Sequence, residues 1–112
     1  MIHVKNIRTF KAKDYPNAHV ERIDRTTTLG NPYPIDKNNS REDVIELYRG
    51  YLNRARQRYV MTGDPSIWED VKRLAKIARE KDVVLLCWCA PQPCHGDVIK
   101  SAIKWLNKEG DV

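Results

Sequence analysis

The sequence predicts a small mixed α/β protein, and three observations carry that prediction. Residues 83–89 form an unbroken apolar run, which is typical of a central strand covered on both faces of a sheet. Three longer segments repeat their apolar residues at helical spacing. Short segments near the N-terminus alternate with period two instead. A buried strand that leads into a helix indicates a two-layer or three-layer sandwich with a short sheet and about three helices, in a single domain over residues 1–112.

The N-terminal part is expected to be extended. Ile2 and Val4 alternate with polar side chains and predict a first strand, and residues 19–23 predict a second. Residues 14–17 predict a turn between the two strands. Residues 25–34 show no periodicity and contain one glycine and two prolines, so a loop with many hydrogen-bonding side chains should follow the second strand.

The first helix is expected over residues 41–60. Ser40 is a favourable N-cap, and acidic residues in the first turn suit the helix dipole. At about 100° per residue, four arginines fall on two flanks of the apolar stripe, so their stems should cover the edges of that stripe. The stripe consists of Val44, Tyr48, Tyr51, Leu52, Ala55 and Tyr59, with Arg49 and Arg56 on one flank and Arg54 and Arg58 on the other.

Two further helices complete the expected order β, β, α, α, β, α. Asp64 should cap the second helix, with Pro65 at its first position, and residues 81–82 should end it. Two prolines after the buried strand prevent the strand from continuing. The third helix should therefore begin near Cys94, and Gly110 suits its C-cap.

Composition and charge limit the classes of protein function that fit this sequence. The 112 residues include 20 Lys and Arg and 15 Asp and Glu, a net charge of +5. The excess lies in residues 1–62, with twelve basic and seven acidic residues, whereas residues 63–112 contain eight of each. A phosphate-bearing partner is one explanation of this excess. No apolar run approaches the ~18 residues of a membrane-spanning helix, and residues 1–10 lack a signal-peptide core, so a cytoplasmic protein without a membrane partner is expected.

The most specific motif holds all three cysteines of the chain, Cys87, Cys89 and Cys94, and continues with His95 and Asp97. Its last part falls at a predicted helix start, where backbone N–H groups stabilise a thiolate and accept anions. Ligands of open α/β sheets bind at such strand–helix junctions. One interpretation therefore assigns catalytic roles to three of these residues, with Cys94 as an activated thiol, His95 as a group that moves a proton, and Asp97 beside them.

Two other interpretations of this motif are open. Three thiols and an imidazole are the ligand types of a tetrahedral zinc site, which would use Cys87, Cys89, Cys94 and His95, although their spacing is not that of common zinc modules. Alternatively the residues are structural. In that case Cys87 packs as a small apolar residue in the central strand, and His95 caps the helix.

A second polar motif follows the second strand, in residues 22–31. Arginine presents a rigid fork to carboxylate or phosphate, and glycine allows close approach to the backbone. The alternative is a loop that satisfies its own backbone through Asn and Thr side chains. Because both motifs follow strands, they should meet at one edge of the sheet. The candidate ligand-binding residues are Arg22, Arg25, Thr26, Thr27, Gly30 and Asn31.

Together the two motifs resemble an uncharacterised bacterial and phage family, the domain of unknown function 4326. The resemblance covers about residues 20–106. It rests on residues 20–25 and 29–32, a helix that contains Tyr48, and residues 87–89 with Pro91, Pro93 and residues 94–97. The family has no established activity, so the resemblance implies only a bacterial or phage domain whose motif residues gather in one site.

These observations lead to one expected function and two alternatives. We expect a site between residues 25–31 and 94–97 that binds, or acts on, a nucleotide or another phosphorylated or anionic small molecule, without a cofactor. The first alternative is a zinc-stabilised nucleic-acid-binding module whose helical arginines contact phosphate. The second is a phage accessory protein that binds a host protein. The sequence leaves enzymatic activity and oligomeric state open.

Overall fold

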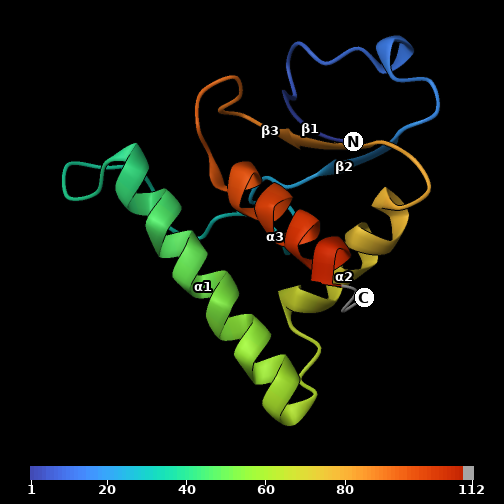
Figure 1. Ribbon diagram of the computed structural model, residues 1–112. Coiled ribbons are helices and arrows are strands. Elements are labelled where there is room, and N and C mark those ends of the chain that lie inside the picture. Colours follow the sequence, from blue (N-terminus) through green and yellow to red (C-terminus); the bar gives the residue numbers. More distant parts are fainter. Residues whose placement is uncertain (110–112) are drawn as a thin grey trace.

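The computed structural model describes residues 1–109, which form a three-stranded parallel sheet and three α-helices (Figure 1). The elements are β1 (Ile2–Asn6), a short 3₁₀ helix η1 (Ala12–Asp14), β2 (His19–Arg22), α1 (Arg41–Thr62), α2 (Ile67–Ala78), β3 (Val83–Cys87) and α3 (His95–Glu109). The mixed α/β class and the predicted order of strands and helices are confirmed. The expected C-cap at Gly110 lies outside the described residues.

The sheet has the order β1-β3-β2, so the strand that comes last in the sequence lies between the other two. Ile2 pairs with Val83 at one end of β1, and Asn6 pairs with Cys87 at the other. β2 pairs with β3 in parallel as well, from His19 opposite Val83 onward. All carboxyl ends of the strands therefore lie at one edge of the sheet. Within residues 1–109, none of the helices is long and apolar enough to cross a membrane.

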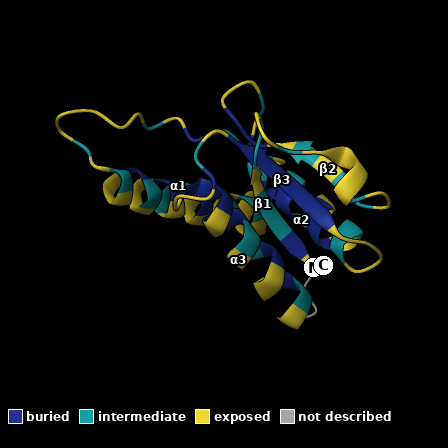
Figure 2. Cartoon of the chain, turned by 90° about the horizontal axis from the view of Figure 1, so that it is seen from above, coloured by how far each residue is buried: buried dark blue, intermediate teal, exposed yellow. Residues whose placement is uncertain are grey.

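The helices cover one face of the sheet, and residues 7–18 with η1 lie over the other (Figure 1). α2 and α3 pack against each other and on the strands, while α1 packs on both helices from outside. β3 is buried along its whole length (Figure 2), because Val84 and Leu86 face away from the helices and are covered as well. The core under the helices includes Ile23, Leu29, Tyr48, Leu74, Leu85, Ile99, Ile103 and Leu106.

β3 ends at Cys87, two residues earlier than the apolar run predicts. β1 ends opposite Cys87 and β2 ends opposite Leu86, so the ladder has no further partners. Asn6 replaces the ladder there, because its Nδ2 donates to the carbonyls of Trp88 at 3.1 Å and Ala90 at 3.0 Å. The chain turns away after Cys87, and the Trp88 side chain is exposed.

The start of α1 is capped as the sequence predicts, whereas the start of α2 differs from the prediction. Ser40 Oγ accepts the N–H of Asp43 at 3.1 Å, and the Asp43 carboxylate accepts the N–H of Ser40 at 2.9 Å. α2 begins at Ile67 with Ser66 as N-cap, not at Pro65 with Asp64 as the cap. The Asp64 carboxylate lies 3.8 Å from the Arg58 guanidinium instead.

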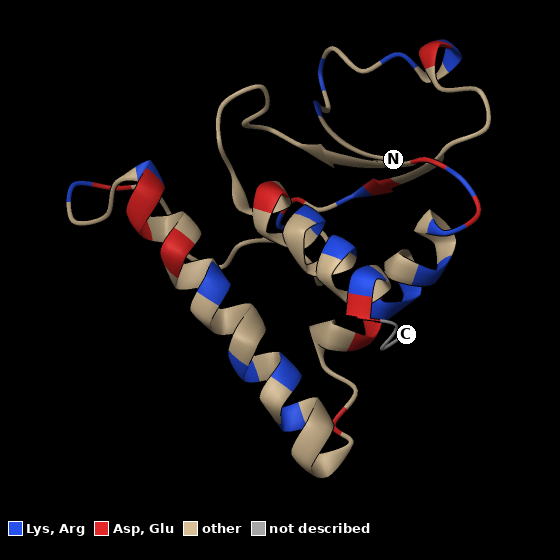
Figure 3. Ribbon diagram, viewed as in Figure 1, with Lys and Arg blue, Asp and Glu red and all other residues tan. Residues whose placement is uncertain are grey.

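α1 contains five arginines, and the four in its central and C-terminal parts do not share one face (Figure 3). Arg49 and Arg56 line a groove between α1 and α3, where the Arg56 guanidinium lies 4.7 Å from the centre of the Trp105 ring. Arg54 lies on the other flank and contacts the Tyr33 hydroxyl at 3.4 Å.

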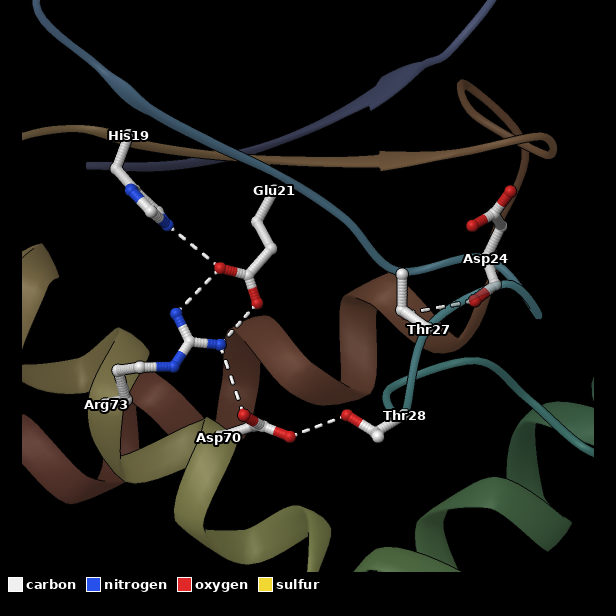
Figure 4. Close-up of polar contacts among 7 residues, drawn as sticks. All are labelled: His19, Glu21, Asp24, Thr27, Thr28, Asp70 and Arg73. Carbon is white, nitrogen blue, oxygen red and sulfur yellow. Dashed lines mark hydrogen bonds and ion pairs between the residues drawn. The ribbon is translucent and has the colours of Figure 1, made fainter.

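A polar network ties β2 and the loop that follows it to α2 (Figure 4). The Arg73 guanidinium donates to both carboxylate oxygens of Glu21, at 2.7 and 2.5 Å, and to Asp70 at 3.2 Å. The second oxygen of Asp70 accepts the Thr28 hydroxyl at 2.6 Å. His19 Nε2 lies 2.9 Å from Glu21 on the other side. The network fixes the start of the polar loop relative to the helical layer.

Candidate functional site

The two polar motifs meet at the carboxyl edge of the sheet, as predicted from their positions after strands. His95 Nε2, in the first turn of α3, lies 2.6 Å from the carbonyl oxygen of Ile23, which follows β2. Trp88 Nε1, just after β3, donates to the Asp24 carboxylate at 3.2 Å. The two contacts join segments that are 72 and 64 residues apart in the chain.

Asp24 is the centre of the loop after β2. Its carboxylate is buried and accepts hydrogen bonds from Arg22 Nη2 and Thr26 Oγ1, both at 2.6 Å. The Arg22 guanidinium, then the Thr26 hydroxyl and the Trp88 indole, lower the pKa of Asp24 from 3.8 to about 2. Its main-chain carbonyl accepts the Thr27 hydroxyl at 3.0 Å. The loop is therefore organised around one ionised carboxylate.

α1 holds the second half of the loop through two buried side chains. The Tyr48 hydroxyl donates to the carbonyl of Leu29 at 2.8 Å. Asn31 Nδ2 donates to the carbonyl of Val44 at 3.1 Å, and its Oδ1 accepts the N–H of Tyr33 at 2.9 Å. The Asn31 amide, predicted to contact a ligand, thus bridges the loop and the helix.

Removal of the Tyr48 hydroxyl should destabilise the fold, because Tyr48 and Leu29 are both fully buried. Tyr48→Phe leaves the Leu29 carbonyl without this donor and should lower the free energy of unfolding by about 1–3 kcal/mol. Urea unfolding monitored by circular dichroism measures the change. Tyr59→Phe is the control, since the hydroxyl of this partly exposed residue only accepts from Lys72, and a loss within about 0.5 kcal/mol is expected. Equal losses in both variants would contradict the role of Tyr48.

Five of the six predicted ligand-binding residues are engaged within the protein. Arg22, Thr26 and Thr27 bind Asp24, Gly30 packs against the backbone of residues 24–25, and Asn31 binds α1.

Arg25 differs from the other five. Its Nε donates to the carbonyl of Asn31 at 3.0 Å, and its side chain is exposed. Within residues 1–109, its terminal nitrogens Nη1 and Nη2 make no hydrogen bond. Arg25 therefore keeps guanidinium N–H donors that no other group in the described residues engages.

Two adjoining pockets open at this edge. The first, which we term the arginine pocket, has a volume of about 160 Å³. It is lined by Arg25, Asn31, Tyr33, Ile35, Arg41, Val44, Ile45, Cys89, Pro93, Cys94 and His95, so none of its lining residues is acidic. The second, the cysteine pocket, has a volume of about 350 Å³ and is lined by Asp24, Arg25, Thr26, Asn31, Cys87, Trp88, Cys89 and His95. The pockets share four residues, which makes them parts of one site.

Two of the three cysteines face each other. The sulfurs of Cys87 and Cys94 lie 3.3 Å apart and are almost completely buried. The Ala90 N–H donates to Cys87 Sγ at 3.4 Å, and the Gly96 N–H donates to Cys94 Sγ at 3.3 Å.

Cys94, which the sequence analysis proposed as an activated thiol, is one member of this pair of thiols. The hydrogen bond from the Cys94 thiol, helped by backbone N–H groups, lowers the pKa of Cys87 to about 6. The pKa of Cys94 rises correspondingly, because its proton is shared with Cys87 and its sulfur is buried. The contact between the two sulfurs therefore favours a state in which the pair shares one proton.

His95 is neutral at pH 7. Burial is the main reason that its pKa falls below the ordinary 6.5, and the nearby charge of Arg25 lowers it further, against the opposing hydrogen bond to Ile23. Since a carbonyl oxygen only accepts, Nε2 carries the hydrogen in this contact. The lone pair is therefore on Nδ1. The ring also packs edge-on against Tyr48, with centroids 4.9 Å apart.

Asp97 stabilises the start of α3. Its carboxylate accepts the N–H of Cys94 at 3.1 Å, and its own N–H donates to the Cys94 carbonyl at 3.0 Å. The Gly96 N–H is bonded to the Cys94 sulfur. These N–H groups, which the sequence suggested for a bound anion, have partners in the protein. Within the described part of the chain, no group of three or more His, Cys, Asp and Glu side chains is arranged to hold a metal ion.

Sequence reasoning missed Arg41, which lines the arginine pocket and whose Nη1 donates to the Pro93 carbonyl at 3.3 Å. The position of Arg41 in the sequence is the signal that could have identified it. Arg41 is the first residue of α1, where the helix dipole disfavours a cation. A basic residue at that position, directly before Glu42 and Asp43, indicates a role other than helix stability.

The parallel sheet, its one helical layer and the two pockets at its carboxyl edge define a mixed α/β protein with adjoining pockets after β2 and β3. Within that class, the family model described as Domain of unknown function (DUF4326) matches residues 6–105, and the chain belongs to this family. The match confirms the resemblance of the sequence motifs. A search of curated proteins and a search of solved structures found no match.

Proposed function

We propose that the protein binds a small anionic molecule, such as a nucleotide or another phosphorylated metabolite, with its phosphate in the arginine pocket. The observation that carries this proposal is that Arg25 and Arg41 line the pocket from two separate elements, and no carboxylate lines it. Guanidinium groups bind phosphate through paired, charge-assisted hydrogen bonds. Two of them in a pocket without an acidic lining residue favour an anionic ligand, since Asp24 of the adjoining cysteine pocket is already paired with Arg22.

Both guanidinium groups are held by one contact each. Arg25 is fixed through Nε by the Asn31 carbonyl, and Arg41 through Nη1 by the Pro93 carbonyl. The remaining N–H donors are available to a ligand. Holding the arginines in advance reduces the side-chain entropy that binding would otherwise remove.

The cysteine pocket offers room for the rest of such a ligand. Its volume of about 350 Å³ lies at the lower end of the range of small-molecule sites, about 300–1,000 Å³. The exposed Trp88 ring at its rim provides an aromatic surface, and its indole N–H is fixed on Asp24. The proposed ligand therefore places phosphate between the arginines and a flat apolar group beside Trp88.

Calorimetric titration with inorganic pyrophosphate and a set of nucleoside mono- and diphosphates tests the proposal. At least one of these anions should bind, and Arg25→Ala and Arg41→Ala should each weaken that binding about tenfold or more. The reason is that a hydrogen bond to a charged group contributes about 1.5–3 kcal/mol, and about 1.4 kcal/mol is tenfold. The affinity should also fall as salt is added.

Arg58→Ala is the matched control, because this arginine lies at the far end of α1 and faces Asp64. It should bind the same anion as tightly as the wild type. Thermal melting of each unliganded variant shows that the fold is kept. Absence of binding by every anion tested, or equal affinities of the wild type and both pocket variants, would contradict the proposal.

A further inference from the structure

We propose that Cys87 and Cys94 form a redox-active dithiol, which a small hydroperoxide converts into an intramolecular disulfide. This assigns a modification site to the buried part of the carboxyl edge, independently of whether the arginine pocket binds an anion. The inference rests on the approach of the two sulfurs, on the backbone groups that face them, and on their position beside the pockets.

The two sulfurs are already close. They lie 3.3 Å apart, and a disulfide requires about 2.05 Å, so each sulfur must move by well under one ångström. The residues come from two different elements, since Cys87 ends β3 and Cys94 directly precedes α3. Six residues with two prolines separate them, so the chain between them is short and restricted.

Backbone N–H groups face both sulfurs, from Ala90 to Cys87 and from Gly96 to Cys94. Such donors stabilise a thiolate, the form that reacts with peroxides. Cys94 supplies the second thiol within contact distance, as a resolving cysteine does. Structural cysteines in an apolar core have no need of either arrangement.

Access to the pair is through the pockets. Cys87 and Cys94 are only 1% and 3% exposed, which excludes bulky reagents. Cys87 nevertheless lines the cysteine pocket, and Cys94 lines the arginine pocket. A molecule the size of hydrogen peroxide fits either volume. Cys89 also lines both pockets and is more exposed, but its sulfur has no contact with another sulfur among the described residues.

The reaction proceeds in two steps. Cys87, which lines the larger of the two pockets, attacks one peroxide oxygen as a thiolate, the O–O bond breaks, and hydroxide leaves, which yields a sulfenic acid on Cys87. Cys94 sulfur then attacks Cys87 sulfur, the S–O bond breaks, and the hydroxyl leaves as water with a proton. The dithiol loses two electrons and two protons overall, and the peroxide is reduced to water.

Mass spectrometry of the whole protein tests the proposal. The folded, reduced protein is treated with hydrogen peroxide, and free thiols are alkylated in denaturant before and after that treatment, so that buried thiols also react. Three thiols should be alkylated before treatment and one afterwards, and dithiothreitol should restore all three. A tryptic peptide after Lys81 contains all three cysteines, so chymotryptic cleavage after Trp88 is needed to separate Cys87 from the others. The two chymotryptic peptides should be joined without reductant.

Three cysteine variants identify which two residues form the disulfide. Cys89→Ser is the matched control and should form the disulfide as the wild type does, whereas Cys87→Ser should form none. Cys94→Ser should leave a sulfenic acid on Cys87 that dimedone traps. Circular dichroism confirms the fold of each variant, and the wild type and Cys89→Ser remain decisive if the other two unfold.

Alkylation of all three wild-type thiols after peroxide would overturn the proposal. A bond that includes Cys89, or one between two molecules, would overturn it too. Elemental analysis of the purified protein provides a further outcome. One equivalent of zinc that is removed only when the protein unfolds would identify the thiols as metal ligands and would contradict the proposal.

Discussion

Gly30→Ala should lower the free energy of unfolding by about 1–3 kcal/mol, or more if the loop cannot move. A Cβ atom at this position would lie 2.5 Å from the carbonyl oxygen of Asp24 and 2.6 Å from the Cα of Arg25. Both are main-chain atoms, and they belong to the turn that begins the polar loop. Relief of the clash therefore requires displacement of the backbone that carries Arg25. The same variant should accordingly bind the anion of the proposed site more weakly.

Gly50→Ala is the matched control for this prediction. Gly50 lies in the interior of α1, and a Cβ there would meet only the far end of the flexible Arg54 side chain, at 3.2 Å. Alanine in a helix is favoured over glycine by about 0.5–1 kcal/mol, so this variant should be as stable as the wild type or more stable. Both substitutions restrict the unfolded chain equally, which leaves the clash as the difference. Urea unfolding of the two variants measures it, and a Gly30→Ala protein as stable as Gly50→Ala would contradict the prediction.

The sequence was sufficient for most of the fold, since each element has a strong local signal. The apolar run ending at Cys87 requires cover on both faces, and Ser40 with Asp43 forms the capping box that starts α1. The predictions were wrong where contacts between distant parts of the chain, and not the local sequence, determine the structure. β3 stops where its neighbours stop, and Asp64 turns to Arg58 rather than capping α2. Neither the end of β3 nor the partner of Asp64 can be inferred from the local sequence pattern.

The candidate site was predictable in position but not in the roles of its residues. Two polar segments that follow parallel strands must meet at one edge, and they do. A threonine or asparagine in a loop, however, looks the same whether it faces a ligand or its own backbone. The Thr27 hydroxyl and the Asn31 amide bond to main-chain groups of the protein, whereas Arg25 and Arg41 line the arginine pocket with N–H donors left over. For Asn31 the distinction depends on how α1 packs on the loop, which the local sequence pattern does not specify.

Asp24→Asn should destabilise the protein at neutral pH, and the loss should be pH-dependent. Asparagine keeps one acceptor oxygen but removes the charge that Arg22 faces at 2.6 Å, and it offers Trp88 and Thr26 one acceptor where the carboxylate has two. Loss of a charge-assisted contact at a buried acceptor corresponds to about 1–3 kcal/mol. Since Asp24 joins the loop after β2 to Trp88 after β3, the variant should also loosen the cysteine pocket.

The sign of the pH effect follows from the lowered pKa of Asp24, about 2 against an ordinary 3.8. A carboxyl whose pKa is lowered in the folded state stabilises it fully above 3.8, and this stabilisation is lost as the pH falls towards about 2. The variant has no such group. The difference in stability between wild type and Asp24→Asn should therefore be constant at neutral and mildly acidic pH and shrink below about pH 4.

Thermal or urea unfolding of both proteins at about pH 7, 5 and 3 measures that difference. Asp64→Asn is the control carboxylate, because its arginine partner is 3.8 Å away and both side chains are half-exposed. Its removal should change stability by no more than about 1 kcal/mol. Other acidic groups titrate in the same pH range, but they are common to both proteins and cancel in the difference. A difference that is equally large at about pH 3 and pH 7 would show that Asp24 acts through its shape and not through its charge. In that case the ionised carboxylate would not be what organises the loop that presents Arg25.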